Sequence, residues 1–465
     1  MTSVLASEFE MLRRFPGQRV VGRVAELRGL SVLVDELPLP VGALVRIDRG
    51  VLEGAAWGEV VGFSRDRAIV MLLSRAGSLR AGQAVVGEQA SQVVGVGESM
   101  IGRVLDGMGR AIDGGPALGR LAPAALEPDP VAALSRGRVK RQLLTGVRAI
   151  DLMTPVGRGQ RLGIFAGPGV GKSTLLGQIA RDTSADLAVV ALIGERGREV
   201  RDFIEDALGE AGMRRAIVFV ATGDESPVMR VRAAKMACAA AEHFRDHGRS
   251  VLLMMDSVTR FAHAQRQIGL AVGEPPATKG YTPSVFASMA LLLERAGALD
   301  EHAGGGSITG LYTILVEGDD MTEPVADAAR GILDGHVVLS RRLAQSGHFP
   351  AIDVLQSVSR VADDVTDRGQ GEARRQVVRM MAAYREVEEL VQVGAYAAGS
   401  SPEADAAIVV RERIASLLRQ GRNERMDFAR ARDEMVKVAL ESGEDVARRR
   451  AATGQVAASP RGRSA

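Results

Sequence analysis

The segment FAGPGVGKSTLL, residues 165–176, constrains the fold of this 465-residue chain more than any other stretch. It follows the apolar run RLGIF and leads into STLLGQIARD, a segment of helical length. Glycines between a strand and a helix let the backbone curl so that its N–H groups point inward. Together with the helix N-terminus, these groups form a cradle for an anion. The sequence therefore predicts a strand, a phosphate-binding loop and a helix, in that order.

The loop matches the general signature of nucleotide phosphate loops at its defining C-terminal end. Gly171, Lys172 and Ser173 stand where the signature has Gly-Lys-Ser/Thr, whereas Ala166 replaces its first glycine. We expect Lys172 to reach the β- and γ-phosphates of ATP and the Ser173 hydroxyl to ligate Mg²⁺. The predicted ATP-binding residues of the loop are Ala166, Gly167, Pro168, Gly169, Val170, Gly171, Lys172, Ser173 and Thr174.

Hydrolysis of a bound nucleotide needs two further groups, a carboxylate for the metal and a group that orients the attacking water. The run VLLMMDS places Asp256 at a strand end, where it can hold Mg²⁺ or, alternatively, cap a helix. The run LAVVALIGERGREV places Glu195 just past another buried strand. Open α/β sheets bind ligands at the carboxyl ends of parallel strands, so Glu195 can face the γ-phosphate. A surface glutamate in a turn is the alternative.

Three regions of the chain differ in the spacing of their apolar residues. Over 20–98, short valine-rich runs separated by turns predict a small antiparallel barrel or sandwich. Over 99–370, apolar runs alternate with segments of helical length, which predicts an α/β fold with a mostly parallel sheet. From 371 to 447, apolar residues recur at helical spacing and predict a helical domain. The strands expected in the middle region are RLGIFAG, LAVVALIG, AIVFVAT, VLLMMDS and LYTILVEG.

Composition limits the functional classes that remain. A net charge of +2 and an aromatic content of 3% offer neither a basic surface nor stacking platforms, so we expect no nucleic-acid partner. The single cysteine, Cys238, is expected in the core and fits a reducing compartment. No apolar run reaches the roughly 18 residues of a bilayer span, and the N-terminus lacks a signal-peptide pattern. We therefore expect a soluble, cytoplasmic protein, with a separate N-terminal segment over 1–19 and a disordered basic tail over 448–465.

Several longer stretches resemble the β-subunit superfamily of rotary ATPases, and within it the type III protein-export ATPases of the flagellum and the injectisome. These stretches are GRVLDGMGRAIDG, GERGREV, GDDMTEPVADAARGILDGHVVLSRRLA and GHFPAIDVLQSVSRV. The resemblance extends from about residue 20 to 445, and Ala166 is itself usual in the export branch. It implies a RecA-like core with a phosphate loop, preceded by a small N-terminal β-barrel and followed by a helical C-terminal domain.

The resemblance also implies roles for single residues. Glu195 would activate the attacking water, and Arg196 would lie near the γ-phosphate. Arg230, in DESPVMR, matches a phosphate-side arginine of the family. Arg360, in SVSRV, matches an arginine finger that meets charge developing in the neighbouring subunit's transition state, with a surface ion pair as the alternative. Phe349, in GHFPAID, falls where the family places an aromatic ring against adenine, with a buried core position as the alternative.

One chain that carries both the phosphate loop and a finger for its neighbour can complete every site in a ring of identical subunits. We therefore expect a homohexamer that hydrolyses MgATP. The resemblance implies that hydrolysis drives or primes type III export of unfolded proteins, and chain length favours the flagellar system over the injectisome. It also implies a stator-like regulatory protein, the export gate, export substrates and chaperones as partners, and a peripheral location at the inner face of the bacterial membrane.

Other functions share part of these features. A ring-shaped nucleic-acid motor would share the phosphate loop, but its N-terminal domain should be basic and rich in aromatic residues. Residues 20–98 contain only Trp57 and Phe63 as aromatics, which argues against such a motor. A subunit of an ion-translocating rotary ATPase would share the fold and the site, and an unspecialised ATPase stays possible on the residues alone.

Overall fold

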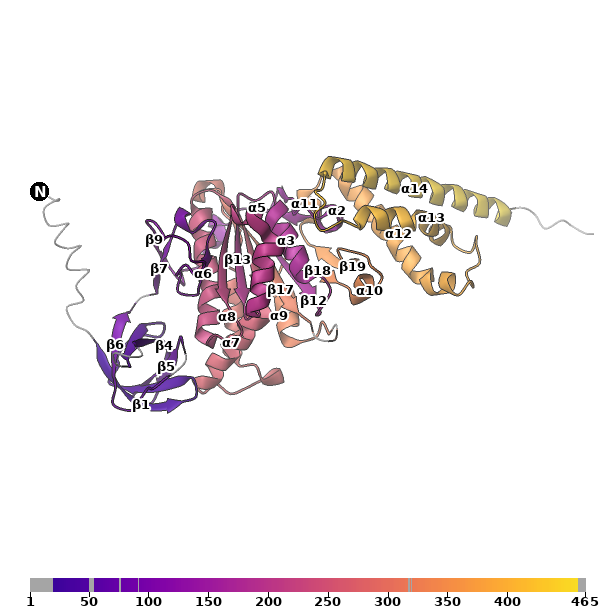
Figure 1. Cartoon of the computed structure of the whole chain (residues 1–465). Helices are drawn as coiled ribbons and strands as arrows, with labels where there is room; N and C mark the ends of the chain where they lie inside the picture. Colours follow the sequence, from indigo (N-terminus) through magenta and orange to yellow (C-terminus); the bar gives the residue numbers. More distant parts are fainter. Residues whose placement is uncertain are drawn as a thin grey trace, which may run out of the picture.

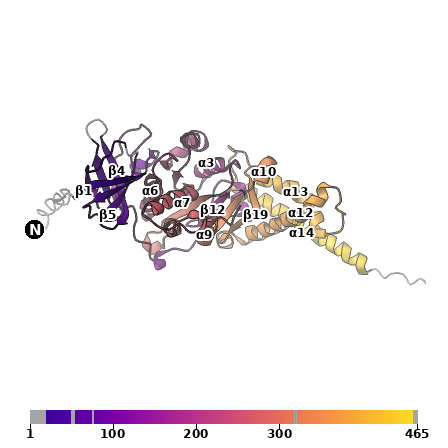
Figure 2. The ribbon, with the colours of Figure 1, turned by 90° about the horizontal axis from the view of Figure 1, so that it is seen from below.

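The structure is a computed structural model that describes residues 20–458, apart from 50–53, 75–76, 91, 317 and 319. A β-barrel, a sheet flanked by helices and a group of long helices follow one another along the molecule (Figure 1). The barrel and the long helices lie at opposite ends (Figure 2). The segment 1–19, expected as a separate unit, lies outside the described residues. No helix in the described part of the chain is long and apolar enough to span a lipid bilayer.

The N-terminal region forms a closed antiparallel barrel, which confirms the predicted barrel. Its strand order is β1-β2-β5-β4-β3-β6. Inward-facing valines and Ile47 are fully buried and form the barrel's own core. The strands are β1 (Val21–Arg28), β2 (Ser31–Asp35), β3 (Leu44–Asp48), β4 (Ala55–Ser64), β5 (Arg67–Leu72) and β6 (Ala84–Gln89).

The middle region forms a nine-stranded sheet with the path β19-β18-β12-β17-β15-β13-β14-β8, to which β16 adds beside β17. The strands are parallel except that β19 is antiparallel to β18 and β16 to β17. The five strands expected from the sequence occupy its centre. The strands are β8 (Val104–Leu105), β12 (Arg161–Ala166), β13 (Leu187–Ile193), β14 (Ala216–Ala221), β15 (Ser250–Asp256), β16 (Gly297–Ala298), β17 (Ser307–Leu315), β18 (Gly335–Leu339) and β19 (Ile352–Ser359).

Both faces of this sheet are buried, as near-continuous apolar strands predict. In β13, Val189 and Ala191 belong to one hydrophobic cluster, whereas Ala188 and Val190 belong to the other. Helices α6, α7, α8 and α9 cover the first face, and α2 and α3 the second. The helices are α2 (Arg148–Met153), α3 (Lys172–Asp182), α4 (Gly197–Asp202), the π-helical η3 (Phe203–Leu208), α5 (Gly209–Met213), α6 (Pro227–Asp246), α7 (Val258–Ala271), α8 (Pro283–Leu293), α9 (Pro324–Ile332), α10 (Arg341–Gln345) and α11 (Ala362–Val365).

Short elements connect these parts. Cys238 lies on α6 and is fully buried, so its predicted core position is confirmed. The short strands are β7 (Val93–Val96), β9 (Ala122–Ala125), β10 (Gln142–Leu143) and β11 (Val156–Gly157). The 3-10 turns are η1 (Glu98–Met100), η2 (Ala133–Ser135), η4 (Thr278–Gly280) and η5 (Glu301–Ala303).

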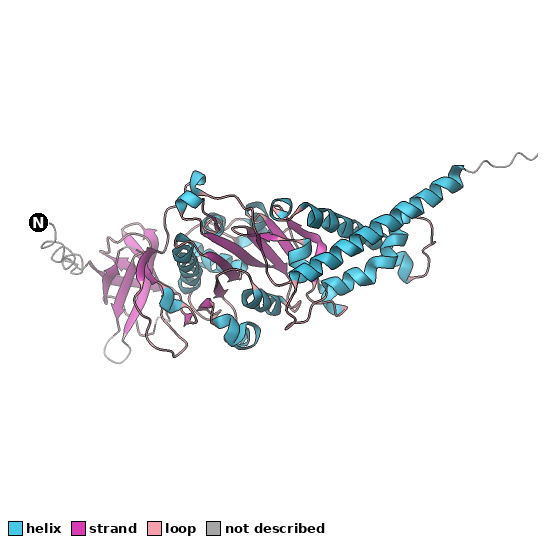
Figure 3. Cartoon of the chain, turned by 90° about the horizontal axis from the view of Figure 1, so that it is seen from above, coloured by secondary structure: helices cyan, strands magenta, loops and turns pink. Residues whose placement is uncertain are grey.

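The C-terminal region is helical, as its apolar spacing predicts. It consists of α12 (Arg368–Gln392), α13 (Pro402–Leu418) and α14 (Phe428–Ala458), which pack against one another (Figure 3). Val377, Val410 and Met435, one from each helix, are buried in the cluster that also covers the second face of the sheet. The helical region is therefore continuous with the core of the central sheet.

The expected disorder of 448–465 is wrong for residues 448–458, which continue α14. The basic residues that suggested a solvated tail are paired with carboxylates. Arg449 lies 2.7 Å from Asp445, one helical turn earlier, and 3.5 Å from Asp405 of α13. Such i,i+4 pairs support a helix. Residues 459–465 lie outside the described part of the chain.

Candidate active site

The predicted phosphate loop, residues 166–173, connects the end of β12 to the start of α3. Ala166 ends β12 and is fully buried. Gly169 and Gly171 have φ angles of 77° and 87°, a left-handed conformation that glycine adopts without strain. Gly171 is the N-cap of α3, and Ser173 and Thr174 are exposed in its first turn. The start of α3 therefore combines unpaired helix N–H groups with exposed hydroxyl residues, which suits an anion and its metal.

Three charged groups from separate elements meet beside this loop. The Lys172 ammonium contacts Oδ1 of Asp256, at the end of β15, and lies 3.5 Å from Oε1 of Glu195, just after β13. Burial lowers the pKa of Lys172, but the charges of Asp256 and Glu195 outweigh burial and hold it above its ordinary value. The structure thus brings together three of the residues predicted for catalysis and metal binding.

Asp256 is buried, with 3% of its surface exposed. Its Oδ1 also accepts a 2.8 Å hydrogen bond from the Thr313 hydroxyl on β17. The alternative role as a helix cap falls to the next residue, because the Ser257 hydroxyl accepts the backbone N–H of Arg260 at the start of α7. Thr313 was missed from the sequence, although a hydroxyl residue inside the apolar run LYTILVEG is a usable signal for it.

Glu195 is 8% exposed, so the alternative of a surface glutamate does not fit its position. Burial raises the pKa of Glu195 to about 7, the charge of Lys172 opposes this, and the charge of Asp256 and a hydrogen bond with Glu199 add to it. A carboxyl group with a pKa close to neutral is suited to exchange a proton with water at physiological pH.

Two residues that sequence reasoning missed hold this carboxyl region in place. Arg260 donates from Nη1 to the backbone oxygen of Gly194 at 2.9 Å, next to Glu195. Glu199 shares a hydrogen bond with Glu195, which lowers its own pKa. Each follows a predicted site residue by four positions, Glu199 after Glu195 and Arg260 after Asp256. Glu195 and Asp256 each lie two residues before a helix, α4 and α7, so the first turn of each helix was a place to look for neighbours of the site.

The two arginines expected near the γ-phosphate differ in exposure. The Arg196 side chain is 86% exposed and lies 3.4 Å from Glu199, so it is at the rim of the site. Arg230 is buried on α6 and donates from Nη2 to Oε1 of Gln267 at 2.9 Å. Burial, followed by the charge of Arg260, lowers the pKa of Arg230.

Phe349 lies against the phosphate loop and not in the core. Phe349 is 46% exposed. Cε1 of its ring lies 3.6 Å from the position that a Cβ atom on Gly171 would occupy. The backbone oxygen of Phe349 accepts the N–H of Gln420, just after α13, at 3.0 Å. An exposed ring beside the loop can stack on a base, and its backbone contacts the helical region.

Arg360 lies at the opposite edge of the sheet from its own phosphate loop. It directly follows β19, whose last residue, Ser359, pairs with Gly335 at the start of β18. β18 is parallel to β12, so Arg360 is level with the start of β12, which lies about 17 Å along the strand from its end. Its guanidinium is exposed, donates to Arg330 O at 3.4 Å, and forms no ion pair with any residue that the structure describes. The alternative of a surface ion pair therefore does not fit, and Arg360 cannot reach its own site.

The donor set fits Mg²⁺. Among the described residues, no group of three or more His, Cys, Asp or Glu side chains could hold a metal by itself. The exposed Ser173 hydroxyl and the Asp256 carboxylate instead provide protein oxygens beside the phosphate cradle. Mg²⁺ suits such a site because it keeps several waters and takes its other ligands from substrate phosphates.

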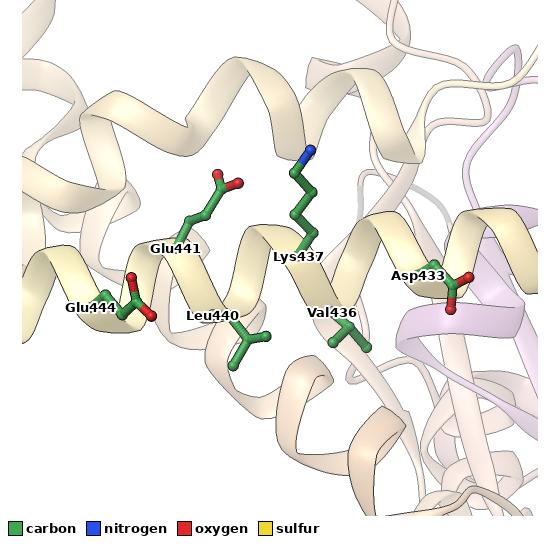
Figure 4. Close-up of a pocket in the computed structure, with 6 residues that line it drawn as sticks. All are labelled: Asp433, Val436, Lys437, Leu440, Glu441 and Glu444. Carbon is green, nitrogen blue, oxygen red and sulfur yellow. The ribbon is translucent and has the colours of Figure 1, made fainter.

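A groove of about 410 Å³ on α14 is distinct from this site (Figure 4). It lies in the helical region, and Figure 4 shows its side chains projecting from successive turns of one helix. Its acidic residues include Glu441, which pairs with Arg413 of α13. The lining residues are Asp433, Val436, Lys437, Leu440, Glu441 and Glu444. They provide no phosphate cradle.

Known proteins are similar to this chain over most of its length. The model of the ATP synthase alpha/beta family, nucleotide-binding domain, matches residues 146–359, and that of the T3SS EscN ATPase C-terminal domain matches residues 366–437. The flagellum-specific ATP synthase of Treponema pallidum is 48% identical over 96% of this chain and 99% of its own length. The type 3 secretion system ATPase of Xanthomonas euvesicatoria is 46% identical over 86% and 90%, respectively.

A solved structure shares the fold over nearly the whole described chain. It is the assembled ATPase EscN in complex with its central stalk EscO, from the type III secretion system of enteropathogenic E. coli. Its TM-score is 0.82 at 38% identity, and the match covers 90% of this chain and 100% of EscN.

Proposed function

The chain belongs to the family of flagellum-specific ATP synthases and type 3 secretion system ATPases, and we propose that it hydrolyses MgATP to drive or prime type III export of unfolded proteins. The observation that carries this proposal is the convergence of Lys172, Glu195 and Asp256 beside a phosphate loop. The flagellar system is favoured, since the flagellar relative is the more similar over the greater length.

Each side chain of the cluster has a chemical task in the proposed reaction. The phosphate loop and Lys172 bind the β- and γ-phosphates, and Glu195 orients and polarises the water for in-line attack on phosphorus. With a pKa of about 7, Glu195 can accept the proton of that water. Ser173 and Asp256 would hold Mg²⁺, which neutralises charge on the phosphate oxygens. The ring of Phe349 would stack on adenine, and Arg196 would approach from the rim.

The position of Arg360 supports a ring in which each site is shared between subunits. A guanidinium at the edge opposite its own loop can act only on a neighbour's nucleotide, where it would stabilise the charge of the departing phosphoryl group. Repetition of that contact by identical chains closes a ring, which we propose is a homohexamer.

The assembled EscN binds a central stalk, EscO, and we propose a stalk-like partner for the present chain. The contact between Phe349 and Gln420 supports a route by which the nucleotide state reaches the helical region. We further propose that this region meets export substrates, chaperones and the export gate. A stator-like protein would bind the N-terminal end and hold the ring at the inner face of the membrane.

The test is to measure ATPase rate against protein concentration, with mass photometry on the same samples. Specific activity that rises as hexamers appear supports the proposed ring and distinguishes it from a rotary ATPase that needs a second kind of subunit. A rate per chain that is constant and arises from monomers would contradict the shared site.

A further inference from the structure

The segment Thr222–Ser226, which joins β14 to α6, contacts both the backbone of Glu195 and the barrel. The N–H of Gly223 donates to the backbone oxygen of Glu195 at 3.1 Å. Three residues later, the Ser226 hydroxyl donates to the backbone oxygen of Leu73 at 3.3 Å. Leu73 directly follows barrel strand β5 and donates its own N–H to Trp57 O of β4 at 2.8 Å. A short segment therefore links the barrel to Glu195.

This segment is held in one conformation by its own hydrogen bonds. The Thr222 N–H donates to Oε1 of Glu225 at 3.1 Å, and the Thr222 hydroxyl donates to Oδ1 of Asp224 at 2.6 Å. The backbone N–H of Glu225 donates to the backbone oxygen of Thr222 at 3.1 Å. A turn closed in this way moves as one piece, so a shift at Ser226 displaces Gly223 as well.

Ser226 makes two different hydrogen bonds with one hydroxyl. As the N-cap of α6, its oxygen accepts the N–H of Met229 at 3.2 Å. The same hydroxyl donates its hydrogen bond to the backbone oxygen of Leu73. The residue is 9% exposed, so water does not readily replace either partner. The two roles can be separated, because an aspartate at this position would keep the cap but could not donate.

A second contact fixes α6 against the barrel. Nη1 of Arg232 donates to Oε2 of Glu59 on β4 at 2.8 Å, and the two side chains are only 3% and 11% exposed. Met71 and Leu73 of the barrel belong to the same hydrophobic cluster as β13, which ends next to Glu195. The barrel and the sheet therefore pack as one body around the N-terminal part of α6.

From these contacts we propose that Ser226 is a positioning residue for ATP hydrolysis. By fixing Gly223 relative to the barrel, it holds the backbone of Glu195 where the side chain can meet the attacking water. The inference rests on the proposed function, in which Glu195 polarises that water. Positioning of this kind matters because a displacement of about 1 Å at a reacting group can lower a rate by about 100-fold.

The test compares Ser226→Asp, Ser226→Ala and Ser226→Thr in the full-length oligomer. Aspartate keeps the cap and removes the donor, alanine removes both, and threonine keeps both. We expect kcat to fall about tenfold or more in Ser226→Asp and Ser226→Ala, with KM for ATP unchanged, and to recover in Ser226→Thr. The matched control is Ser401→Ala, which removes an equivalent N-cap bond, to Ala404, in the helical region. It should keep the native kcat.

A second readout separates positioning from a loss of folded enzyme. Burial raises the pKa of Glu195 to about 7, so a Glu195 displaced toward solvent should titrate at lower pH. The acidic limb of kcat/KM should therefore move to lower pH in Ser226→Ala, which adds no charge to the site, and a smaller active fraction cannot cause such a shift. Gly223→Ala perturbs the same contact without touching the barrel, since its Cβ would lie 3.1 Å from Gly194 O, and should also lower kcat.

Native kcat in Ser226→Asp, an unshifted acidic limb in Ser226→Ala, or native kcat in Gly223→Ala would overturn the inference. Failure of the underlying function has a different signature. If Glu195→Gln hydrolyses ATP at the native rate, the assignment of Glu195 is wrong whatever the Ser226 variants do. If Glu195→Gln is inactive while Ser226→Asp keeps its rate, only the positioning role fails.

Discussion

The ammonium group of Lys172 lies 3.5 Å from Oε1 of Glu195, although the two residues are 23 positions apart and follow different strands. The same ammonium contacts Asp256, so one cation is shared between two carboxylates. Burial of this cluster raises the pKa of Glu195. A change at Glu195 therefore alters both the acid–base chemistry of the site and the charge that Lys172 offers to a phosphate.

Replacing the carboxylate of Glu195 by an amide should stop turnover and leave ATP bound. Glutamine has the same shape but cannot accept a proton, and general-base catalysis is worth about 10²–10⁴-fold. We expect Glu195→Gln to lower kcat by that range, with unchanged or tighter binding of a fluorescent ATP analogue, because Lys172 loses a competing carboxylate. Glu205→Gln, on a side chain that is 66% exposed, is the control and should keep both values. A kcat within a few-fold of native would contradict the role of Glu195.

The pH dependence of hydrolysis should report Glu195 and respond to Glu199. In the proposed mechanism Glu195 acts without its proton, and its pKa is about 7, so kcat/KM should fall as the pH drops below about 7. The hydrogen bond with Glu199 stabilises protonated Glu195, so Glu199→Gln should lower the pKa of Glu195 and move the acidic limb to lower pH. A complete pH–rate profile of each variant measures this. An unmoved limb in Glu199→Gln would show that the limb belongs to another group.

The exposed ring of Phe349 should contribute to ATP affinity. Stacking of a base on an aromatic side chain is worth about 1–3 kcal/mol, so Phe349→Ala should raise KM for ATP about fivefold or more. Phe349→Tyr should keep the native KM because the ring stays beside Gly171. Phe63→Ala, at a barrel position that is 51% exposed, controls for loss of an exposed ring. An unchanged KM in Phe349→Ala would argue against stacking at this position.

Much of the site could be predicted because its chemistry is local in sequence. The phosphate loop is continuous, and the apolar runs before Glu195 and Asp256 place both carboxylates at strand ends. What joins them is topology: β17 lies between β12 and β15, which also brings Thr313 to Asp256. No spacing in the sequence reveals a partner 57 positions away.

The features that escaped the sequence depend on contacts between distant elements. The basic run near residue 448 suggested a solvated tail, yet its arginines find carboxylates on two helices. The place of Arg196 near the γ-phosphate stays a prediction, since its side chain lies at the exposed rim of the site. The link from Ser226 to the barrel joins residues 153 positions apart, so only the packed structure reveals it.

The buried ion pair between Glu59 and Arg232 should stabilise the chain asymmetrically. Burial raises the pKa of Glu59, so a carboxyl left without Arg232 can take up a proton, whereas the guanidinium cannot lose its own. Glu59→Leu should therefore lower the free energy of unfolding by about 3–5 kcal/mol, seen as a lower thermal midpoint. Arg232→Met should lower the thermal midpoint less. The double variant should recover much of the loss, because both charges are removed. Equal losses that add in the double variant would contradict this account.

Mixing two inactive variants should restore hydrolysis if Arg360 acts on the neighbouring subunit. Arg360→Ala keeps its phosphate loop but lacks the finger, and Lys172→Ala keeps the finger but lacks a working loop. In random rings mixed one to one, about a quarter of the sites pair an intact loop with an intact finger, so we expect about a quarter of the native rate.

A mixture of Lys172→Ala with Glu195→Gln is the matched control for this complementation. Both changes damage the loop-bearing side of a site, so no ring of these chains contains a complete site. Arg368→Ala, which removes a 91% exposed side chain close to Arg360 in sequence, should be fully active on its own. If Arg360 completes the neighbour's site, ATP hydrolysis recovers in the first mixture and does not recover in the control. If neither mixture recovers activity although mass photometry shows mixed rings, Arg360 does not complete its neighbour's site.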